Sequence, residues 1–167
     1  MTNTTKHLDP LRSQCASLAG IKSADWDLRF IELAGHVAGW SRDPSTQVGA
    51  VITRDKKVIS LGYNGFPAGV EDSHERLHNR DLRLKYTIHA EENAILTAKA
   101  DLAGCTCYTW PIQPCARCAA KLAQVGIVRV VAPLPSAGHR DRWGEDFAVA
   151  ETIFAEVGIK LELIDGA

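Results

Sequence analysis

The sequence lacks an apolar run long enough to cross a lipid bilayer, and residues 1–20 lack the apolar core of a signal peptide. It also lacks an excess of charge of either sign, because 19 Lys and Arg residues stand against 20 Asp and Glu residues. Neither a membrane nor a nucleic-acid polymer is therefore an expected partner, since no basic stripe is present. Five cysteines, an odd number, argue against a disulfide framework. We expect reduced thiols and a cytoplasmic protein.

The remaining composition is that of an ordinary globular domain. Of the 167 residues, 46% are hydrophobic and 23% are charged, which suits one domain with a sizeable core. Residues 1–22 are polar and carry no clear period, so we expect a flexible N-terminal leader there. A single domain is expected over residues 23–167.

Hydrophobic spacing over the expected domain alternates between helical and strand periods. The first two expected strands are joined by a short polar turn, which predicts an antiparallel hairpin. The last three are separated by helices, which predicts parallel crossovers. The sequence thus predicts an α/β fold with one mixed five-stranded sheet flanked by helices in three layers. Helices are expected over residues 23–41, 89–100, 114–126 and around 147–157, and strands over 48–53, 58–63, 105–110, 127–132 and 159–164.

Three other features have structural interpretations. Trp26 and Trp40, in the first expected helix, are predicted to pack in the core, with a subunit interface as the alternative. Residues 70–85 are dense in charge and are predicted to form a solvent-exposed flap rather than a specific site. Cys105 and Cys107 share one face of a strand and are expected to be buried, inert thiols.

Two short segments carry the chemistry, namely His89-Ala90-Glu91 and Pro114-Cys115-Ala116-Arg117-Cys118. One imidazole and two thiolates suit a tetrahedral Zn²⁺ ion with one open position, the arrangement of catalytic zinc sites. The two cysteines face the same way on the first turn of a helix, whose dipole favours the thiolate form. Zinc in such a site lowers the pKa of water, and Glu91 is the expected proton carrier if His89 begins its helix.

Two alternatives accompany this interpretation. Glu92, the next residue, is the other candidate for the proton carrier. A fourth ligand such as Cys107 or His36 would close the site and make the zinc structural. That second alternative would leave the glutamate at position 91 and the proline at position 114 without a role.

The pattern H-x-E followed by P-C-x-x-C is identified with the signature of zinc nucleobase deaminases. Beyond it, segments spread over residues 26–165 resemble the deoxycytidylate (dCMP) deaminase family, within the cytidine deaminase superfamily. This resemblance implies a cytidine deaminase-like fold, a homo-oligomer and the hydrolysis of dCMP to dUMP and ammonia, which supplies thymidylate synthesis. The segments that carry it are residues 41–50, 62–69, 85–95 and 114–119.

The same resemblance implies contacts with a small nucleotide substrate. Asn64 would contact the sugar, and Ser41 with Arg42 would lie near the 5′-phosphate. An exposed arginine at a helix end is the alternative interpretation of Arg42. The loop over residues 65–72 would correspond to the region that binds a dCTP or dTTP effector in regulated relatives.

The sequence departs from the family pattern at two places. The family reads Tyr-x-Thr-Leu-x-Pro-Cys where this chain has an extra residue and Trp110-Pro111, in a segment that should border the base. Arg142-Trp143, at the start of the last expected helix, is a further candidate for closing over the base by stacking, with core packing as its alternative. Residues 70–72 lack the cysteine that some relatives use for a second metal ion. The open alternatives are a deaminase of another amino-substituted base, nucleoside or modified nucleotide, and a catalytically silent, zinc-stabilised nucleotide-binding protein.

Overall fold

A computed structural model describes residues 23–165 of the chain, so the predicted leader over residues 1–22 lies outside the described residues. None of the helices in this range has the length and apolar character that a membrane crossing requires. The helices are α2 (Ser23–Ala38), α3 (His74–His78), α4 (Arg80–Tyr86), α5 (Ala90–Thr97), α6 (Ala116–Gln124) and α7 (Ala137–Val157). The strands are β1 (Gly49–Arg54), β2 (Lys57–Tyr63), β3 (Thr106–Trp110), β4 (Arg129–Pro133) and β5 (Lys160–Ile164).

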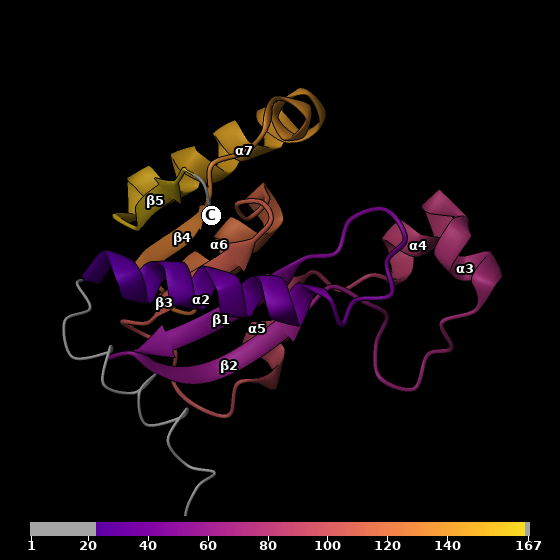
Figure 1. The fold of residues 1–167 in the computed structure, drawn as a ribbon, viewed down its shortest axis with the longest axis horizontal. Helices are drawn as coiled ribbons and strands as arrows, with labels where there is room; N and C mark the ends of the chain where they lie inside the picture. The colour runs from indigo at the N-terminus through magenta and orange to yellow at the C-terminus, as the bar shows by residue number, and fades with distance from the viewer. Residues whose placement is uncertain (1–22, 166–167) are drawn as a thin grey trace, which may run out of the picture.

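The five strands form one mixed sheet in the order β2-β1-β3-β4-β5 (Figure 1). β1 pairs antiparallel with β2 on one side and with β3 on the other. β3, β4 and β5 run parallel to one another, each reached through a helix. The predicted α/β architecture, with its hairpin and its parallel crossovers, is confirmed.

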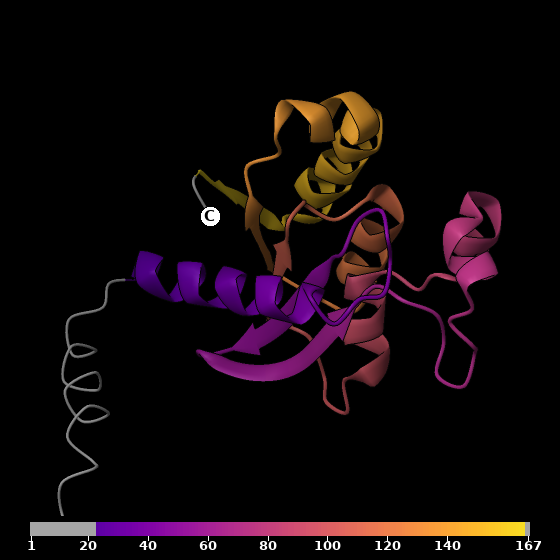
Figure 2. The same ribbon diagram turned by 45° about the vertical axis from the view of Figure 1, so that its right-hand side comes forward.

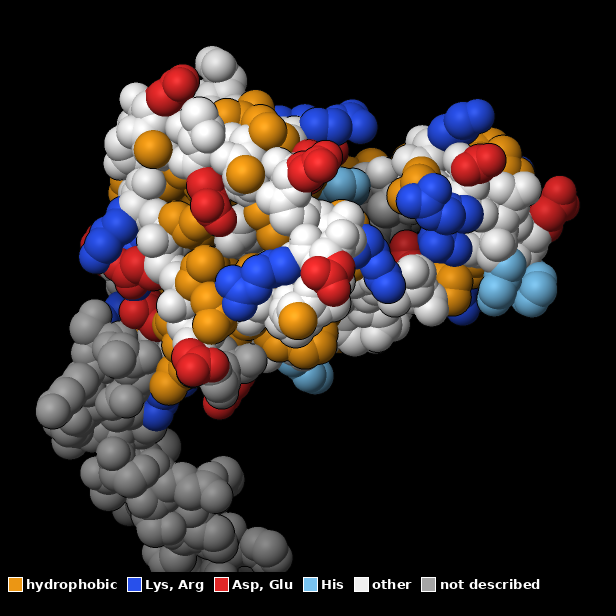
Figure 3. Space-filling model, turned by 90° about the horizontal axis from the view of Figure 1, so that it is seen from above, with side chains coloured by type: hydrophobic (Ala, Val, Ile, Leu, Met, Phe, Trp, Pro, Cys, Tyr) orange, Lys and Arg blue, Asp and Glu red, His pale blue; other side chains and the backbone are white. Residues whose placement is uncertain are grey.

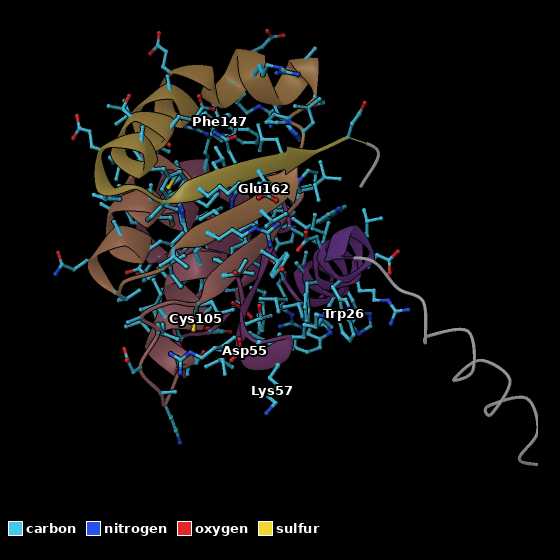
Figure 4. All side chains as sticks on the ribbon, turned by 90° about the vertical axis from the view of Figure 1, so that its left-hand side faces the viewer. Trp26, Asp55, Lys57, Cys105, Phe147 and Glu162 are labelled. Atoms are coloured by element: carbon cyan, nitrogen blue, oxygen red, sulfur yellow. The ribbon has the colours of Figure 1, made fainter. Side chains whose placement is uncertain are left out.

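Successive side chains along the strands point to opposite faces of the sheet and contribute to two hydrophobic cores, one on each face. On one face, Val51 and Tyr108 pack against Phe30 and Ile31 of α2. On the other face, Ala50 and Ile52 belong to a larger cluster that includes side chains of α5, α6 and α7. Figure 4 shows the labelled Trp26 on α2 and Phe147 on α7, on opposite sides of the sheet. The fold therefore has the three layers that the sequence predicts.

Several boundaries differ from the prediction for local reasons. α2 ends at Ala38 rather than near residue 41, and the chain continues in tight turns whose N–H groups bond three residues back. Trp40 lies beyond the helix end and is 50% exposed, so its predicted core position is wrong. Trp26 packs against the hydrophobic cluster between α2 and the sheet, as predicted. Cys105 and Cys107 are buried and free, as predicted.

Two glycines allow helices to lie unusually close to the hairpin. A Cβ atom at Gly49 would lie 2.0 Å from the carbonyl oxygen of Ala34 in α2. On the opposite face, a Cβ atom at Gly62 would lie 2.2 Å from the carbonyl oxygen of Ala90 in α5. Only glycine permits this approach of backbone to backbone. The N-terminal turn of α5 is therefore pressed directly onto β2.

The charged stretch over residues 70–85, predicted only as a flap, contains two short helices, α3 and α4. Ser73 caps α3 by accepting the N–H of Arg76, and Asn79 caps α4 by accepting the N–H groups of Asp81 and Leu82. Figures 1 and 2 show α3 and α4 set apart from the body of the domain. In the view from above (Figure 3) this lobe carries several Lys and Arg side chains. We call residues 70–87 the flap.

Candidate metal centre

The two motif segments meet where α5 and α6 begin. His89 is the N-cap residue of α5 and Cys115 is the N-cap residue of α6, each with an extended backbone conformation. Neither side chain makes a capping hydrogen bond, so the imidazole and the thiol are free to face a common point. The predicted position of His89 at a helix start is confirmed. α6 begins two residues later than predicted, at Ala116, because Cys115 occupies the cap position.

Three side chains form a group with the geometry of a metal site. The Nδ1 atom of His89 lies 3.4 Å from the Sγ atom of Cys115 and 3.4 Å from that of Cys118. All three candidate ligand atoms lie within 4.8 Å of one another. Ligands at ordinary Zn–N and Zn–S distances in a tetrahedral site are about 3.5 Å apart. The donor set and its spacing therefore fit a zinc ion.

The alternative of a closed, four-ligand site finds no support among residues 23–165. The group of metal-ligating side chains contains His89, Cys115 and Cys118 alone. His36 contacts the edge of Trp40 at the end of α2, and Cys107 is buried in the sheet. Three protein ligands leave a fourth tetrahedral position for water or substrate.

The electrostatics of the group favour a cation. Hydrogen bonds from the Cys118 thiol and from the His89 imidazole lower the pKa of Cys115 to about 4. The contact with Cys115 in turn raises the pKa of His89. Cys118 keeps the proton of the thiol pair, since it donates to Cys115 and is buried. The site thus presents a thiolate, a thiol and an imidazole, a soft donor set that suits zinc.

Glu91 lies on the first turn of α5 and is 4% exposed. Burial, assisted by the negative charge of Cys115, raises the pKa of Glu91. A carboxyl group whose pKa is raised by burial is suited to accept and release a proton during a reaction. Glu92 instead forms an ion pair with Lys121 of α6 and does not line the adjoining cavity.

A cavity of about 620 Å³ opens beside the ligand group. His89, Glu91 and Cys115 form one wall of it. Two of the residues with expected substrate contacts, Asn64 and Trp143, line it as well. The remaining lining residues are Asp43, Ser45, Thr46, Val48, Arg80, Arg83, Leu84, Ala90, Ile112, Gln113, Arg142, Asp146 and Phe147.

Residues 24–134 match the model of the cytidine and deoxycytidylate deaminase zinc-binding region. The chain belongs to this family. The family resemblance inferred from the motifs, and zinc as the cofactor, are thereby confirmed.

Two curated proteins and one solved structure illustrate what this chain is similar to. An uncharacterized deaminase of the luxG 3′ region in Aliivibrio fischeri is 45% identical over 136 residues, covering 81% of this chain and 91% of that protein. The deoxycytidylate deaminase of Mus musculus is 34% identical over 142 residues, covering 81% and 77%. The cyanophage S-TIM5 dCMP deaminase, crystallised with dCMP and dUMP, shares the fold with a TM-score of 0.67 at 19% identity, covering 87% of this chain and 100% of that one.

In this deaminase the side chain of Asn64 is held by the loop that precedes β1. Its Oδ1 atom accepts the N–H of Val48 at 2.8 Å, and its Nδ2 atom donates to the carbonyl of Thr46 at 2.9 Å. Ser41 is buried behind this loop, where its hydroxyl donates to the carbonyl of Asn64 at 2.7 Å and accepts the N–H of Asp43. Ser41 therefore supports the wall of the cavity without lining it.

Arg42 and Trp110 lie outside the cavity. The Arg42 side chain is 72% exposed, pairs with Asp72 of the flap at 3.5 Å, and lines a separate small hollow beside Trp40 and Tyr63. The Trp110 ring packs against Gly35 of α2 and borders a separate, open groove that is also lined by residues 43–47. The structure thus does not bring Ser41, Arg42 and Trp110 to the cavity beside the metal ligands.

Three arginines lie on the cavity wall, of which sequence reasoning named Arg142 and missed Arg80 and Arg83. Arg80 and Arg83 come from α4 in the flap, and Arg142 comes from α7. Arg83 is largely buried and pairs with Asp43 at 3.4 Å, which ties the flap to the loop before β1. The high charge density of residues 70–85 carries no sign of which side chains face inward, so the predicted solvent-exposed flap is wrong for Arg83, whereas Arg80 is exposed as predicted although it lines the cavity.

Proposed function

We propose that this chain catalyses the hydrolytic deamination of free dCMP to dUMP with release of ammonia. The observation that carries the proposal is the convergence of the ligand group and buried Glu91 on one cavity with arginine side chains in its walls. Family membership supports the reaction type, and the Mus musculus relative supports the choice of nucleotide.

The chemistry follows from the groups on the cavity wall. A zinc ion held by His89, Cys115 and Cys118 would lower the pKa of water and so make a nucleophile available at neutral pH. The oxygen of water forms a bond to C4 of cytosine, and the bond from C4 to the exocyclic nitrogen breaks. Glu91 accepts the two protons of water in turn and passes the first to ring N3 and the second to the departing amino group, which leaves as ammonia.

The cavity walls also support recognition of a nucleotide. The Nδ2 group of Asn64 retains one N–H for a sugar oxygen after its bond to Thr46. Trp143 and Glu91 line the same cavity, where the indole ring would stack on the base. Arg80 and Arg142 pair with no described acidic residue, and guanidinium groups are preferred partners of phosphate.

We extend the proposal to the assembly and its regulation. A homo-oligomer is supported by the exposed aromatic pair Trp40 and Tyr63, which are 50% and 41% exposed and meet edge to face. A dCTP or dTTP effector is supported by the hollow that Arg42 shares with this pair and with the loop over residues 65–72. The four described cysteines are free, which suits the reducing cytoplasm.

One observation favours a different amino-substituted base as the alternative substrate. Gln113 lines the cavity in the segment that departs from the family pattern, and it is 1% exposed. Its Nε2 group donates to Glu151 at 3.0 Å, while its Oε1 atom has no described partner. Buried acceptors are nearly always hydrogen-bonded, so Gln113 Oε1 is available to accept a hydrogen bond from water or from an amino group of a bound base.

The deciding experiment measures ammonia release by the zinc-loaded protein on a matched panel of substrates. The panel contains dCMP, CMP, deoxycytidine, 5-methyl-dCMP, dAMP and guanine, each with and without dCTP and dTTP. Selective turnover of dCMP is the expected result, and light scattering on the same samples reports the assembly. Turnover of another panel member with inert dCMP would overturn the substrate assignment and leave the deaminase chemistry standing.

A further inference from the structure

Helix α7 contacts the metal-ligand segment at the point where α6 begins. Asp146 of α7 is half-buried and lines the cavity beside Cys115. Its Oδ2 atom accepts the backbone N–H of Ala116 at 3.0 Å. Ala116 is the first residue of α6, directly after the ligand Cys115. A carboxylate from a distant part of the chain therefore bonds to the helix start that carries both thiols.

This bond supplies what the local sequence does not. The first N–H groups of a helix have no partner within the helix, and the N-cap side chain usually accepts one of them. Here the N-cap residue is Cys115, whose sulfur faces His89 and makes no capping bond. Asp146 takes that role across the tertiary structure, and its negative charge suits the positive end of the α6 dipole.

A second bond ties the other flank of Cys115 to the same helix. Gln113 donates through Nε2 to Glu151, which lies on α7 five residues after Asp146. The ligand segment is thus attached to α7 on both sides of Cys115. The same helix carries Arg142 and Trp143, which line the proposed substrate cavity.

We propose that Asp146 is a positioning residue of the metal centre, which holds the Cys115–Cys118 turn in its ligating geometry and joins it to the helix that faces the substrate. The proposal rests on the proposed function in treating this cavity as the active site. It does not depend on which base is deaminated. Partners of metal ligands of this kind change metal affinity by about 10–100-fold when removed.

The test is a double-mutant cycle on zinc affinity, measured by chelator competition without substrate. Asp146→Ala removes the acceptor. Ala116→Pro removes the donor N–H while keeping the helix, because proline is favoured at the first helical position. Cys115 precedes that position with φ −72° and ψ 168°, a conformation that suits a residue before proline.

Matched variants separate positioning from general damage to the fold. Asp146→Asn keeps an acceptor that caps helices about as well as aspartate, so it should bind zinc within about fivefold of the wild type. Glu145→Ala removes the neighbouring exposed carboxylate of α7, which does not line the cavity, and should leave zinc affinity unchanged. The visible absorption of the Co²⁺-loaded protein reports ligand geometry, and thermal unfolding reports stability.

The expected result is a loss of about 10–100-fold in zinc affinity for Asp146→Ala and for Ala116→Pro, with no further loss in the double variant. The Co²⁺ spectrum should change in both single variants and return in Asp146→Asn. Wild-type zinc affinity in Asp146→Ala, or losses that multiply in the double variant, would overturn the proposal. Zinc affinity and the Co²⁺ spectrum are measured without substrate. A failure of the dCMP assignment would not change them, so it can be distinguished from a failure of this proposal.

Discussion

Replacing Gly62 with alanine should weaken the metal centre although residue 62 contacts no ligand. The added Cβ atom would lie 2.2 Å from the carbonyl oxygen of Ala90 and 2.4 Å from the backbone nitrogen of Ala94. Normal contact distances require α5 to move away from β2 by about 1 Å. His89 is the N-cap of this helix, so its Nδ1 atom leaves the position 3.4 Å from both sulfurs.

The magnitude follows from overpacking and from the displaced ligand. Overpacking of this kind costs about 2 kcal/mol, which lowers the Tm of a chain of this length by roughly 4–8 °C. A misplaced histidine should weaken zinc binding by about tenfold, the lower end of the range for altered ligand support. Differential scanning calorimetry and chelator competition measure the two effects separately.

Gly49→Ala is the matched control on the opposite face of the same hairpin. Its Cβ atom would lie 2.0 Å from the carbonyl oxygen of Ala34, so the variant should lose comparable stability. Helix α2, which moves in this case, carries no metal ligand. Equal losses of zinc affinity in the two variants, or an unchanged Tm in Gly62→Ala, would refute the link between Gly62 and the metal centre.

Three further predictions concern the proton carrier, the phosphate contact and the α2 face of the sheet. Glu91→Gln should keep its zinc content by elemental analysis but lose about 10³-fold in kcat, and near wild-type turnover would contradict the assigned role. Arg142→Ala should raise KM for dCMP by tenfold or more, the worth of about one charge-assisted hydrogen bond, and leave the KM for deoxycytidine unchanged; equal shifts for both substrates would exclude a phosphate contact. Hydrogen bonds from Arg129 hold the pKa of Asp27 below its usual value of 3.8, so the stability that this carboxylate contributes is complete above that pH and disappears as pH falls through its lower folded value. Urea unfolding of the wild type should therefore weaken more steeply below about pH 4 than that of Asp27→Asn, and parallel pH curves would argue against this ion pair.

The sequence by itself determined the ligand group, because zinc chemistry demands particular residue types at a spacing that local helix geometry can satisfy. His89, Cys115 and Cys118 are recognisable for that reason, and Glu91 stands at a fixed distance from one of them. The sheet topology was equally readable. Short polar turns permit only antiparallel neighbours, whereas an intervening helix returns the chain parallel.

Only the tertiary structure decided which side chains form the walls around that group. Arg80 and Arg83 lie in a stretch whose many charges look alike in sequence, and only the packing of the flap brings both to the cavity and buries most of the Arg83 side chain. Arg42 belongs to a segment that follows the family pattern and Trp110 to one that departs from it, yet neither side chain lines the cavity. Asp146 reaches Ala116 across 30 residues. Hydrophobic periodicity reports which face of an element is buried, but contacts between distant elements depend on how all of them pack together.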